Sequence, residues 1–351
     1  MPWIAQGYEE EVSEYRAAIA ALTPNVPIAG PDVSGSGVFG EWGEEEALSQ
    51  NPVLLTGHHY PLGCAQTPPP SIESLLSAAT RGLAAQSLAT YMHVASTYRI
   101  PMRIDETNTV SCGGLPGISD TFASALWAVG YITQAMTAGT AGINLQGNPT
   151  NCAGYTPLCT PDPAAVTSGA LRPQPEWYAL LLTRSLVGCR PLPTTVAPAP
   201  IAPAATVPAP GAPVTGAPAP PAAPAGMPNL VDASFSCPDH SLRVALVDDE
   251  PPGSSPLALT LNVGAGLDSA RVMRLTAPAP SATSGVLLAG GAVAAGGSWS
   301  EPASTERLAT HAGTLALELA PSSAVLATVS PAAVRRPTAP THKHRGPARH
   351  S

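Results

Sequence analysis

Charged and aromatic side chains are scarce in this sequence. Of its 351 residues only 11% are Asp, Glu, Lys or Arg and 5% are Phe, Trp or Tyr, and the formal net charge at pH 7 is -8. A protein that binds nucleic acid needs a basic stripe to neutralise phosphates, and basic residues gather here only between Arg335 and His350. We therefore expect no nucleic acid as a partner, and we expect residues 331–351 to form a disordered basic tail.

Long apolar runs are also missing. The sequence has no stretch of about 18 consecutive apolar residues, the length that a membrane-spanning helix requires, so we expect no membrane span. The first residues, from Met1 to Trp3, do not begin a signal peptide, because no basic start is followed by an apolar segment.

The cysteines lack the Cys-x-x-Cys spacing that is typical of zinc sites and thioredoxin-type redox sites. The six are Cys64, Cys112, Cys152, Cys159, Cys189 and Cys237. An even number in a lysine-poor, proline-rich chain indicates an oxidising compartment, and we expect a secreted protein without a cofactor or a metal. Cys152 and Cys159 bracket a short loop and are predicted to form a disulfide. The pairing of the other four stays open, with free buried thiols as the alternative.

Proline and glycine, in contrast, are abundant, with 42 and 32 residues. Between residues 191 and 229 the chain consists almost entirely of Ala, Pro, Val, Thr and Gly, which is typical of an extended, semi-rigid linker. A chain of 351 residues corresponds to roughly two domains. The linker predicts where they lie, at residues 1–190 and 230–330.

Residues 1–190 alternate between strand and helix patterns. Short apolar runs near residues 26, 53, 102 and 142 predict four strands, and helices are predicted over 8–22, 41–48, 71–98, 118–138 and 175–187. Such alternation is typical of a parallel sheet. A closed (β/α) barrel needs eight units and about 250 residues, so the four predicted units correspond to half of one.

Residues 230–330 show short β-type runs separated by turn signals. Strands are predicted over 242–247, 257–263, 270–275, 285–288, 314–319 and 324–329. Short strands with frequent turns are typical of an antiparallel sandwich.

Two histidines and a tyrosine follow the strand predicted at 52–56. Adjacent histidines invite a metal-binding interpretation. Neighbouring side chains of an extended chain point to opposite sides, however, so His58 and His59 make a poor pair of ligands. We favour a place in a substrate cleft for one histidine and for Tyr60.

Asp105 and Glu106 follow the strand predicted near residue 102 and precede a Cys-Gly-Gly loop that opens a long apolar helix. A carboxylate at the C-terminal tip of a strand, followed by a glycine loop and a helix, lies where (β/α) barrels keep their chemistry. For so short a motif, two solvated charges at a strand end are the plainer interpretation. The wider sequence favours the first interpretation, a carboxylate that takes part in the chemistry of a barrel.

Four segments of the chain carry a family resemblance. They are Asp-Glu-Thr-Asn-Thr at 105–109, Gly-Gly at 113–114, Ile-Ser-Asp-Thr-Phe-Ala at 118–123 and Pro-Glu-Trp-Tyr at 175–178. In this order they resemble glycoside hydrolase family 79, the β-glucuronidases and heparanases, over residues 3–192, and the resemblance resumes in the C-terminal region. It implies an α/β fold: the C-terminal half of a (β/α)8 TIM barrel, followed by a small antiparallel β-sandwich domain.

The resemblance also implies a retaining hydrolase that acts on glucuronides or other carbohydrates containing uronic acid. Glu106 matches the family's nucleophile, which forms a glycosyl-enzyme intermediate, and Tyr60 would hydrogen-bond its carboxylate and keep it ionised. The backbone N–H groups of Gly113 and Gly114 would hold the uronate carboxylate. Further candidate substrate ligands are His59, Asn108, Gln146 and Tyr155.

The acid/base residue is missing from the sequence. In family 79 it belongs to an Asn-Glu-Pro motif at the tip of the fourth strand, and no Asn-Glu pair occurs in this chain. We expect the chain to be the C-terminal part of a longer enzyme, which also explains the missing signal peptide, and to be poorly folded or inactive alone. The alternative is a non-catalytic secreted protein, a half barrel tethered to a sandwich that binds a carbohydrate or a cell surface.

Overall fold

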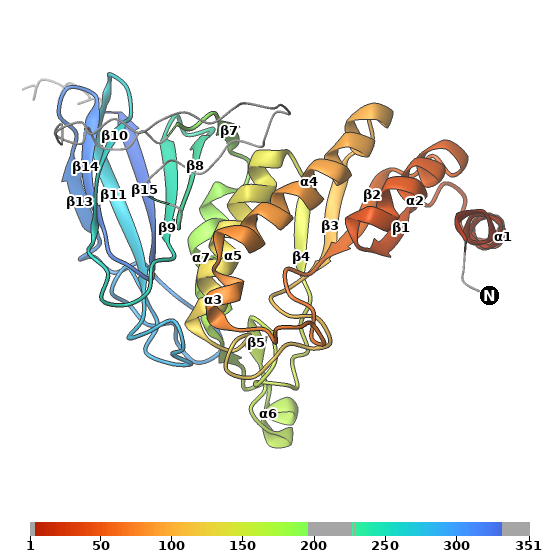
Figure 1. Cartoon of the computed structure of the whole chain (residues 1–351), viewed down its shortest axis with the longest axis horizontal. Coiled ribbons are helices and arrows are strands. Elements are labelled where there is room, and N and C mark those ends of the chain that lie inside the picture. Colours follow the sequence, from red (N-terminus) through yellow and green to blue (C-terminus); the bar gives the residue numbers. More distant parts are fainter. Residues whose placement is uncertain (1–3, 196–226, 228, 332–351) are drawn as a thin grey trace, which may run out of the picture.

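The structure, a computed structural model, describes residues 4–195, 227 and 229–331. Its first part is a four-stranded parallel sheet with the order β1-β2-β3-β4 (Figure 1). The strands are β1 (Ala29–Ser34), β2 (Leu54–His59), β3 (Met102–Thr107) and β4 (Gly142–Leu145). Consecutive parallel strands joined by helices confirm the predicted α/β architecture. Among the described residues, neither β1 nor β4 has a partner strand on its outer edge.

Helices connect and cover these strands. They are α1 (Ala5–Leu22), α2 (Ser36–Ser49), α3 (Ile72–Leu75), α4 (Ala78–Tyr98), α5 (Phe122–Ala138), α6 (Pro163–Ser168), α7 (Pro175–Thr183) and the 3-10 turn η1 (Arg184–Leu186). The prediction of one helix over 71–98 is wrong. The Ser77 side chain accepts a hydrogen bond from the Thr80 N–H, which caps a new helix and separates α3 from α4.

The strands near the candidate site extend farther than predicted. β2 continues through Gly57 to His59, and β3 includes Asp105 and Glu106, so these polar residues belong to strand ends and do not follow them. β1 begins at Ala29, later than the apolar run suggested. The change from apolar to polar residues predicts earlier strand ends, but a strand tip that lines a cleft tolerates polar residues.

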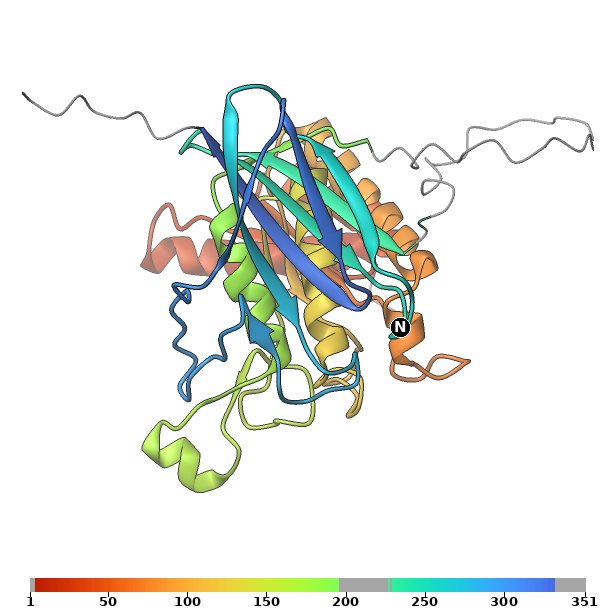
Figure 2. The ribbon, with the colours of Figure 1, turned by 90° about the vertical axis from the view of Figure 1, so that its left-hand side faces the viewer.

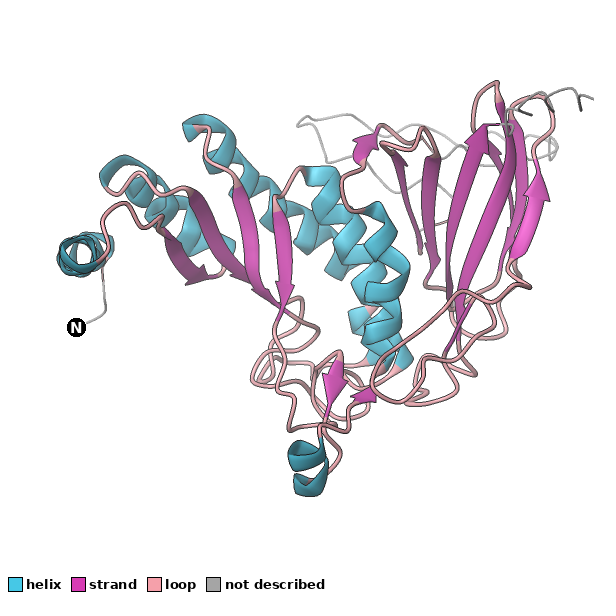
Figure 3. Cartoon of the chain, turned by 180° about the vertical axis from the view of Figure 1, so that it is seen from behind, coloured by secondary structure: helices cyan, strands magenta, loops and turns pink. Residues whose placement is uncertain are grey.

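Helix α5 is buried over most of its length, as its uncharged sequence predicts. It packs against β4 and α4 on one side and against β8 and β9 of the C-terminal sheet on the other. Figures 1 and 3 show α5 and α7 lying between the two sheets. A helix that is covered on both sides needs an apolar surface all round.

The C-terminal part is an antiparallel sheet with the order β12-β11-β15-β9-β8-β7, where β13 also pairs with β11 (Figure 2). Its strands are β7 (Arg190–Leu192), β8 (Leu230–Ser236), β9 (Leu242–Asp248), β11 (Leu267–Thr276), β12 (Leu287–Leu288), β13 (Glu306–Ala309) and β15 (Ser323–Pro331). A second sheet pairs β10 (Leu257–Asn262) with β14 (Thr314–Leu319). A further small pair joins β5 (Leu158–Cys159) to β6 (Arg172–Pro173).

Alternate residues of the large C-terminal sheet enter two different cores. On β9, Ala245 and Val247 belong to the core shared with the helices, whereas Val244 and Leu246 pack toward β10 and β14. This two-residue period is that of a strand covered on both faces. The sheet therefore joins the β-sandwich to the helices of the first part.

The expected linker at 191–229 and the tail at 331–351 lie almost wholly outside the described residues. At the start of the expected linker, β7 pairs with β8 of the C-terminal sheet. Among the described residues no helix is long and apolar enough to cross a membrane.

Three disulfides join the cysteines: Cys64–Cys112, Cys152–Cys159 and Cys189–Cys237. The predicted Cys152–Cys159 pair is confirmed. Three disulfides are compatible with an extracellular protein.

Candidate active site

Glu106 and Tyr60 meet at the tips of the neighbouring strands β3 and β2. The Tyr60 hydroxyl donates a hydrogen bond of 2.9 Å to Glu106 Oε1. Burial, followed by the hydrogen bonds to Tyr155 and Glu106, raises the pKa of Tyr60 far above its ordinary value of 10.0. The phenol therefore stays protonated and remains a donor to the carboxylate.

Irregular strand pairing brings further side chains to this place. β3 carries one extra residue relative to each of its neighbours, and relative to β2 this residue is Asp105. β1 likewise carries one extra residue, Asp32, relative to β2. Such a bulge re-aims the side chains that follow it. His58 consequently has Asp32 on one side, with Nε2 2.6 Å from Oδ1, and Glu106 on the other, with Nδ1 3.7 Å from Oε1.

Sequence reasoning singled out His59 and did not identify His58 or Asp32 as site residues. His59 stacks on Tyr131 of α5, with ring centroids 5.1 Å apart. Burial lowers the pKa of His59 to about 4, so its ring is neutral at pH 7. The alternation of side chains along a strand could have separated the two histidines, had the face covered by α5 been known.

Tyr155 links the strand tips to the loop that follows β4. Its hydroxyl lies 3.1 Å from that of Tyr60 and accepts a hydrogen bond of 3.2 Å from the Gly113 N–H. The Tyr155 N–H in turn donates to the Gly113 carbonyl at 3.4 Å. Because the Cys152–Cys159 disulfide closes the loop around it, Tyr155 is held from both sides.

The glycine loop requires glycine for two reasons. Both Gly113 and Gly114 have positive φ, +94° and +87°, which L side chains rarely adopt. A Cβ at Gly114 would also lie 2.5 Å from the Tyr155 nitrogen, whereas Gly113 has open space. The Cys64–Cys112 disulfide ties this loop to the segment after β2. A uronate carboxylate at the Gly113 N–H would share that donor with the Tyr155 hydroxyl.

Asn108 and Gln146 are placed differently from each other. Asn108 is fully buried, and its amide contacts the Gln146 carbonyl, the Thr109 N–H and the Glu176 carboxyl. We therefore assign Asn108 to the support of the strand tips and not to the substrate. Gln146 is exposed, so it stays a candidate substrate ligand.

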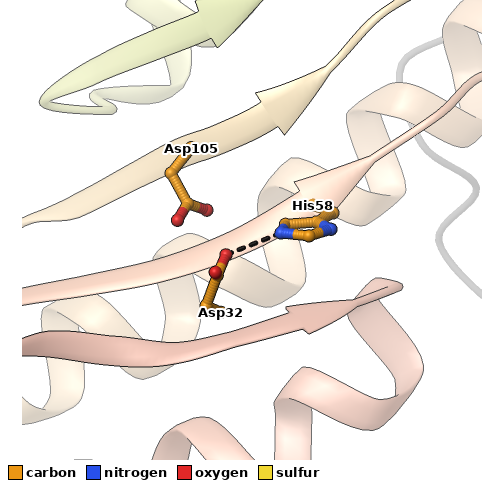
Figure 4. A group of neighbouring side chains, drawn as sticks. All are labelled: Asp32, His58 and Asp105. Carbon is orange, nitrogen blue, oxygen red and sulfur yellow. Dashed lines mark hydrogen bonds and ion pairs between the residues drawn. The ribbon is translucent and has the colours of Figure 1, made fainter. Parts of the chain in front are cut away.

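Asp32, His58 and Asp105 are the described residues that could offer a metal ion three ligands (Figure 4). One ligand atom from each lies within 4.8 Å of the others. Burial and then the neighbouring Asp32 raise the pKa of Asp105, which favours a carboxyl that keeps its proton. The hydrogen bond between His58 and Asp32 already uses two of the three candidate ligand groups, and Asp105 is the third, so we assign no metal to this cluster.

Comparisons with solved structures identify the fold. A 4-O-α-L-rhamnosyl-β-D-glucuronidase from Fusarium oxysporum 12S, solved with Rha-GlcA, aligns with a TM-score of 0.66 and 19% identity over 93% of this chain and 65% of its own. The GH51 arabinofuranosidase from Xanthomonas axonopodis pv. citri aligns with a TM-score of 0.60 and 13% identity, over 93% of this chain and 63% of its own. The GH30 xylanase C catalytic domain from Talaromyces cellulolyticus aligns with a TM-score of 0.52 and 10% identity, over 94% of this chain and 58% of its own.

These neighbours are glycoside hydrolases, and at such low identity they show the fold alone. The chain spans less than two thirds of the length of each. The sequence matches no family model and no curated protein. The described residues thus have the fold of part of a glycoside hydrolase, a parallel barrel sheet followed by antiparallel sheets.

Proposed function

We propose that this chain carries the nucleophile of a retaining glycoside hydrolase of the β-glucuronidase type. The observation that carries the proposal is the contact between Tyr60 and Glu106 at the tips of adjacent parallel strands. One oxygen of Glu106 is held by the phenol. The other, Oε2, has no hydrogen-bond partner among the described residues, so it is free to attack.

The proposed reaction begins when Glu106 Oε2 attacks the anomeric carbon of a β-glucuronide. A C–O ester bond forms, and the bond between the anomeric carbon and the leaving oxygen breaks. Water then attacks the same carbon, loses a proton that balances the one taken up by the leaving oxygen, and releases Glu106 as a carboxylate. Two displacements on opposite faces retain the β configuration.

The preference for a uronic acid is part of the proposal. It is supported by the resemblance to family 79 and by the glucuronide-cleaving enzyme among the structural neighbours. The Gly113 N–H and the Tyr155 hydroxyl form a pair of polar groups that is linked to Glu106 through the Tyr60 hydroxyl, and such groups suit a carboxylate.

The general acid is the missing part of this site. Among the described residues, the side chains that bond or pair with Glu106 are Tyr60 and His58, and neither matches the family's acid/base glutamate. We propose that this carboxyl group belongs to a strand beside β1, whose outer edge has no partner among the described residues. Without it, slow proton transfer to the leaving group would limit the reaction.

A substrate that needs no general acid avoids this limit. With 2,4-dinitrophenyl β-glucuronide the leaving group departs without a proton, and azide replaces the water that the missing residue would activate. We expect this chain to release dinitrophenolate and to form β-glucuronyl azide, whereas E106Q does neither. An α-configured azide would contradict the retaining mechanism.

Absence of both products would favour the non-catalytic alternative. Calorimetric titration with glucuronic acid then shows whether a carbohydrate site is present. If E106Q released dinitrophenolate as fast as the unaltered chain, the assignment of the nucleophile would be wrong.

A further inference from the structure

The Pro-Glu-Trp-Tyr segment at 175–178 contains a carboxyl group that the proposed reaction does not use. Glu176 lies in the first turn of α7 and is only 1% exposed. Its Oε2 accepts a hydrogen bond of 3.3 Å from Asn108 Nδ2, and Oε1 has no partner among the described residues. Burial raises the pKa of Glu176 to about 8, so the carboxyl is uncharged at neutral pH.

Asn108, the hydrogen-bond partner of Glu176, also joins two strand tips. Asn108 Nδ2 also donates to the Gln146 carbonyl at 2.8 Å, just beyond the end of β4. The Gln146 N–H donates to the Thr107 carbonyl at the end of β3, again at 2.8 Å. Asn108 therefore joins β3 and β4 only two residues beyond Glu106.

The same network reaches the glycine loop. Asn108 Oδ1 accepts from the Thr109 N–H at 2.7 Å, and Thr109 Oγ1 donates to Ser119 Oγ at 2.8 Å. Ser119 Oγ also accepts from the Leu115 N–H at 2.9 Å. Both ends of the segment that carries Gly113 and Gly114 are thus tied to buried polar side chains.

We propose that Glu176 is a positioning residue, which fixes the tips of β3 and β4 through Asn108 and so sets the place of Glu106 and of the glycine loop. A protonated carboxyl can accept from Asn108 without a second negative charge in the interior behind the nucleophile. The catalytic part of this inference rests on the proposed function. The structural part does not.

The competing interpretation is that Glu176 only stabilises α7, since an acidic side chain near a helix N-terminus is favourable. Two substitutions of similar volume separate the roles. E176Q keeps an uncharged acceptor for Asn108, whereas E176L fills the space and accepts nothing. E46Q and E46L are matched controls, because Glu46 is also fully buried but lies on α2, where its carboxyl faces Glu9.

Hydrogen exchange of peptides that span residues 105–119 tests the structural part without any catalysis. We expect E176L to speed exchange of these amides about tenfold or more, E176Q to match the unaltered chain, and E46L to leave the segment unchanged. If E176L left exchange there unchanged, or if E176Q behaved like E176L, the proposal would be overturned.

Cleavage of 2,4-dinitrophenyl β-glucuronide in azide tests the catalytic part. We expect E176L to lower kcat about tenfold with KM within about twofold, and E176Q to stay within about twofold of the unaltered chain in both. Equal losses in E176L and E46L would assign Glu176 to stability alone. If the unaltered chain cleaves nothing, the proposed function fails, and hydrogen exchange still decides whether Glu176 positions the loop.

Discussion

The hydroxyl of Tyr155 lies 3.1 Å from the hydroxyl of Tyr60, which donates in turn to the carboxylate of Glu106. This contact joins a disulfide-closed loop after β4 to the tips of β2 and β3. The placement of the proposed nucleophile therefore depends on a residue 49 positions farther along the chain.

Loss of the Tyr60 hydroxyl is expected to slow the first step of the proposed reaction. Tyr60→Phe keeps the ring but removes the donor that holds Glu106 Oε1, and we expect the rate of dinitrophenolate release to fall about tenfold or more. Stopped-flow absorbance measures this rate. Tyr15→Phe, on the exposed side of α1, is the matched control. An unchanged rate in Tyr60→Phe would remove this contact from the mechanism.

Opening the Cys152–Cys159 disulfide is expected to weaken substrate cleavage more than it weakens the fold. The double substitution of both cysteines by Ser frees the loop that carries Tyr155, so kcat/KM should fall about tenfold while the unfolding midpoint changes little, because the closed loop is short. The corresponding change at Cys189 and Cys237 serves as control and should leave kcat/KM unaltered. The opposite pattern would disconnect the loop from the site.

The lowered pKa of the buried His59 ring predicts that the protein loses stability in acid. Burial holds its pKa near 4 in the folded chain, below the ordinary 6.5, so between these values the unfolded chain binds a proton that the folded chain excludes. The free energy of unfolding therefore falls as the pH drops from about 6.5 to 4, by up to about 3 kcal/mol. Urea unfolding of His59→Phe should lack this contribution. The same slope in both proteins would contradict a neutral, buried ring.

The raised pKa of Glu176 predicts the reverse dependence of stability on pH. Its folded pKa of about 8 lies above the ordinary 4.5, so the folded chain keeps a proton that the unfolded chain has released. Its contribution to stability is complete below pH 4.5 and declines as the pH rises toward 8, by about 1.4 kcal/mol per unit at most. E176Q should flatten this decline in urea unfolding between pH 5 and about 8. A decline as steep as in the unaltered chain would indicate an ionised Glu176.

Much of the architecture could be read from the sequence, because strand and helix periodicities differ and the first region alternates between them. The apolar runs predict the two strands that lead to Tyr60 and Glu106, and the structure brings these two residues together. The short spacing of Cys152 and Cys159 predicted their disulfide. The pairing of Cys64 with Cys112 could not be read, since it depends on two loops that meet only when β2 and β3 lie side by side.

The finer geometry of the site had no local signal. Simple alternation places Asp105 and Glu106 on opposite faces, and one extra residue in β3 brings both near His58. Hydrophobic patterns do not reveal a bulge of one residue. Asn108 is a polar residue of the kind that can bind a substrate. Only its contact with Glu176, 68 residues away, indicates that it supports the strand tips.

The most direct test of the central claim is to trap the glycosyl-enzyme intermediate. A 2-fluoro-substituted dinitrophenyl glucuronide forms the ester faster than water can cleave it, and digestion followed by mass spectrometry locates the added uronic acid. We predict the label on Glu106, within the peptide that contains residues 104–107, and no label in E106Q. A label on another carboxylate, such as Asp105 or Asp32, or equal labelling of E106Q, would contradict the assignment of Glu106 as the nucleophile.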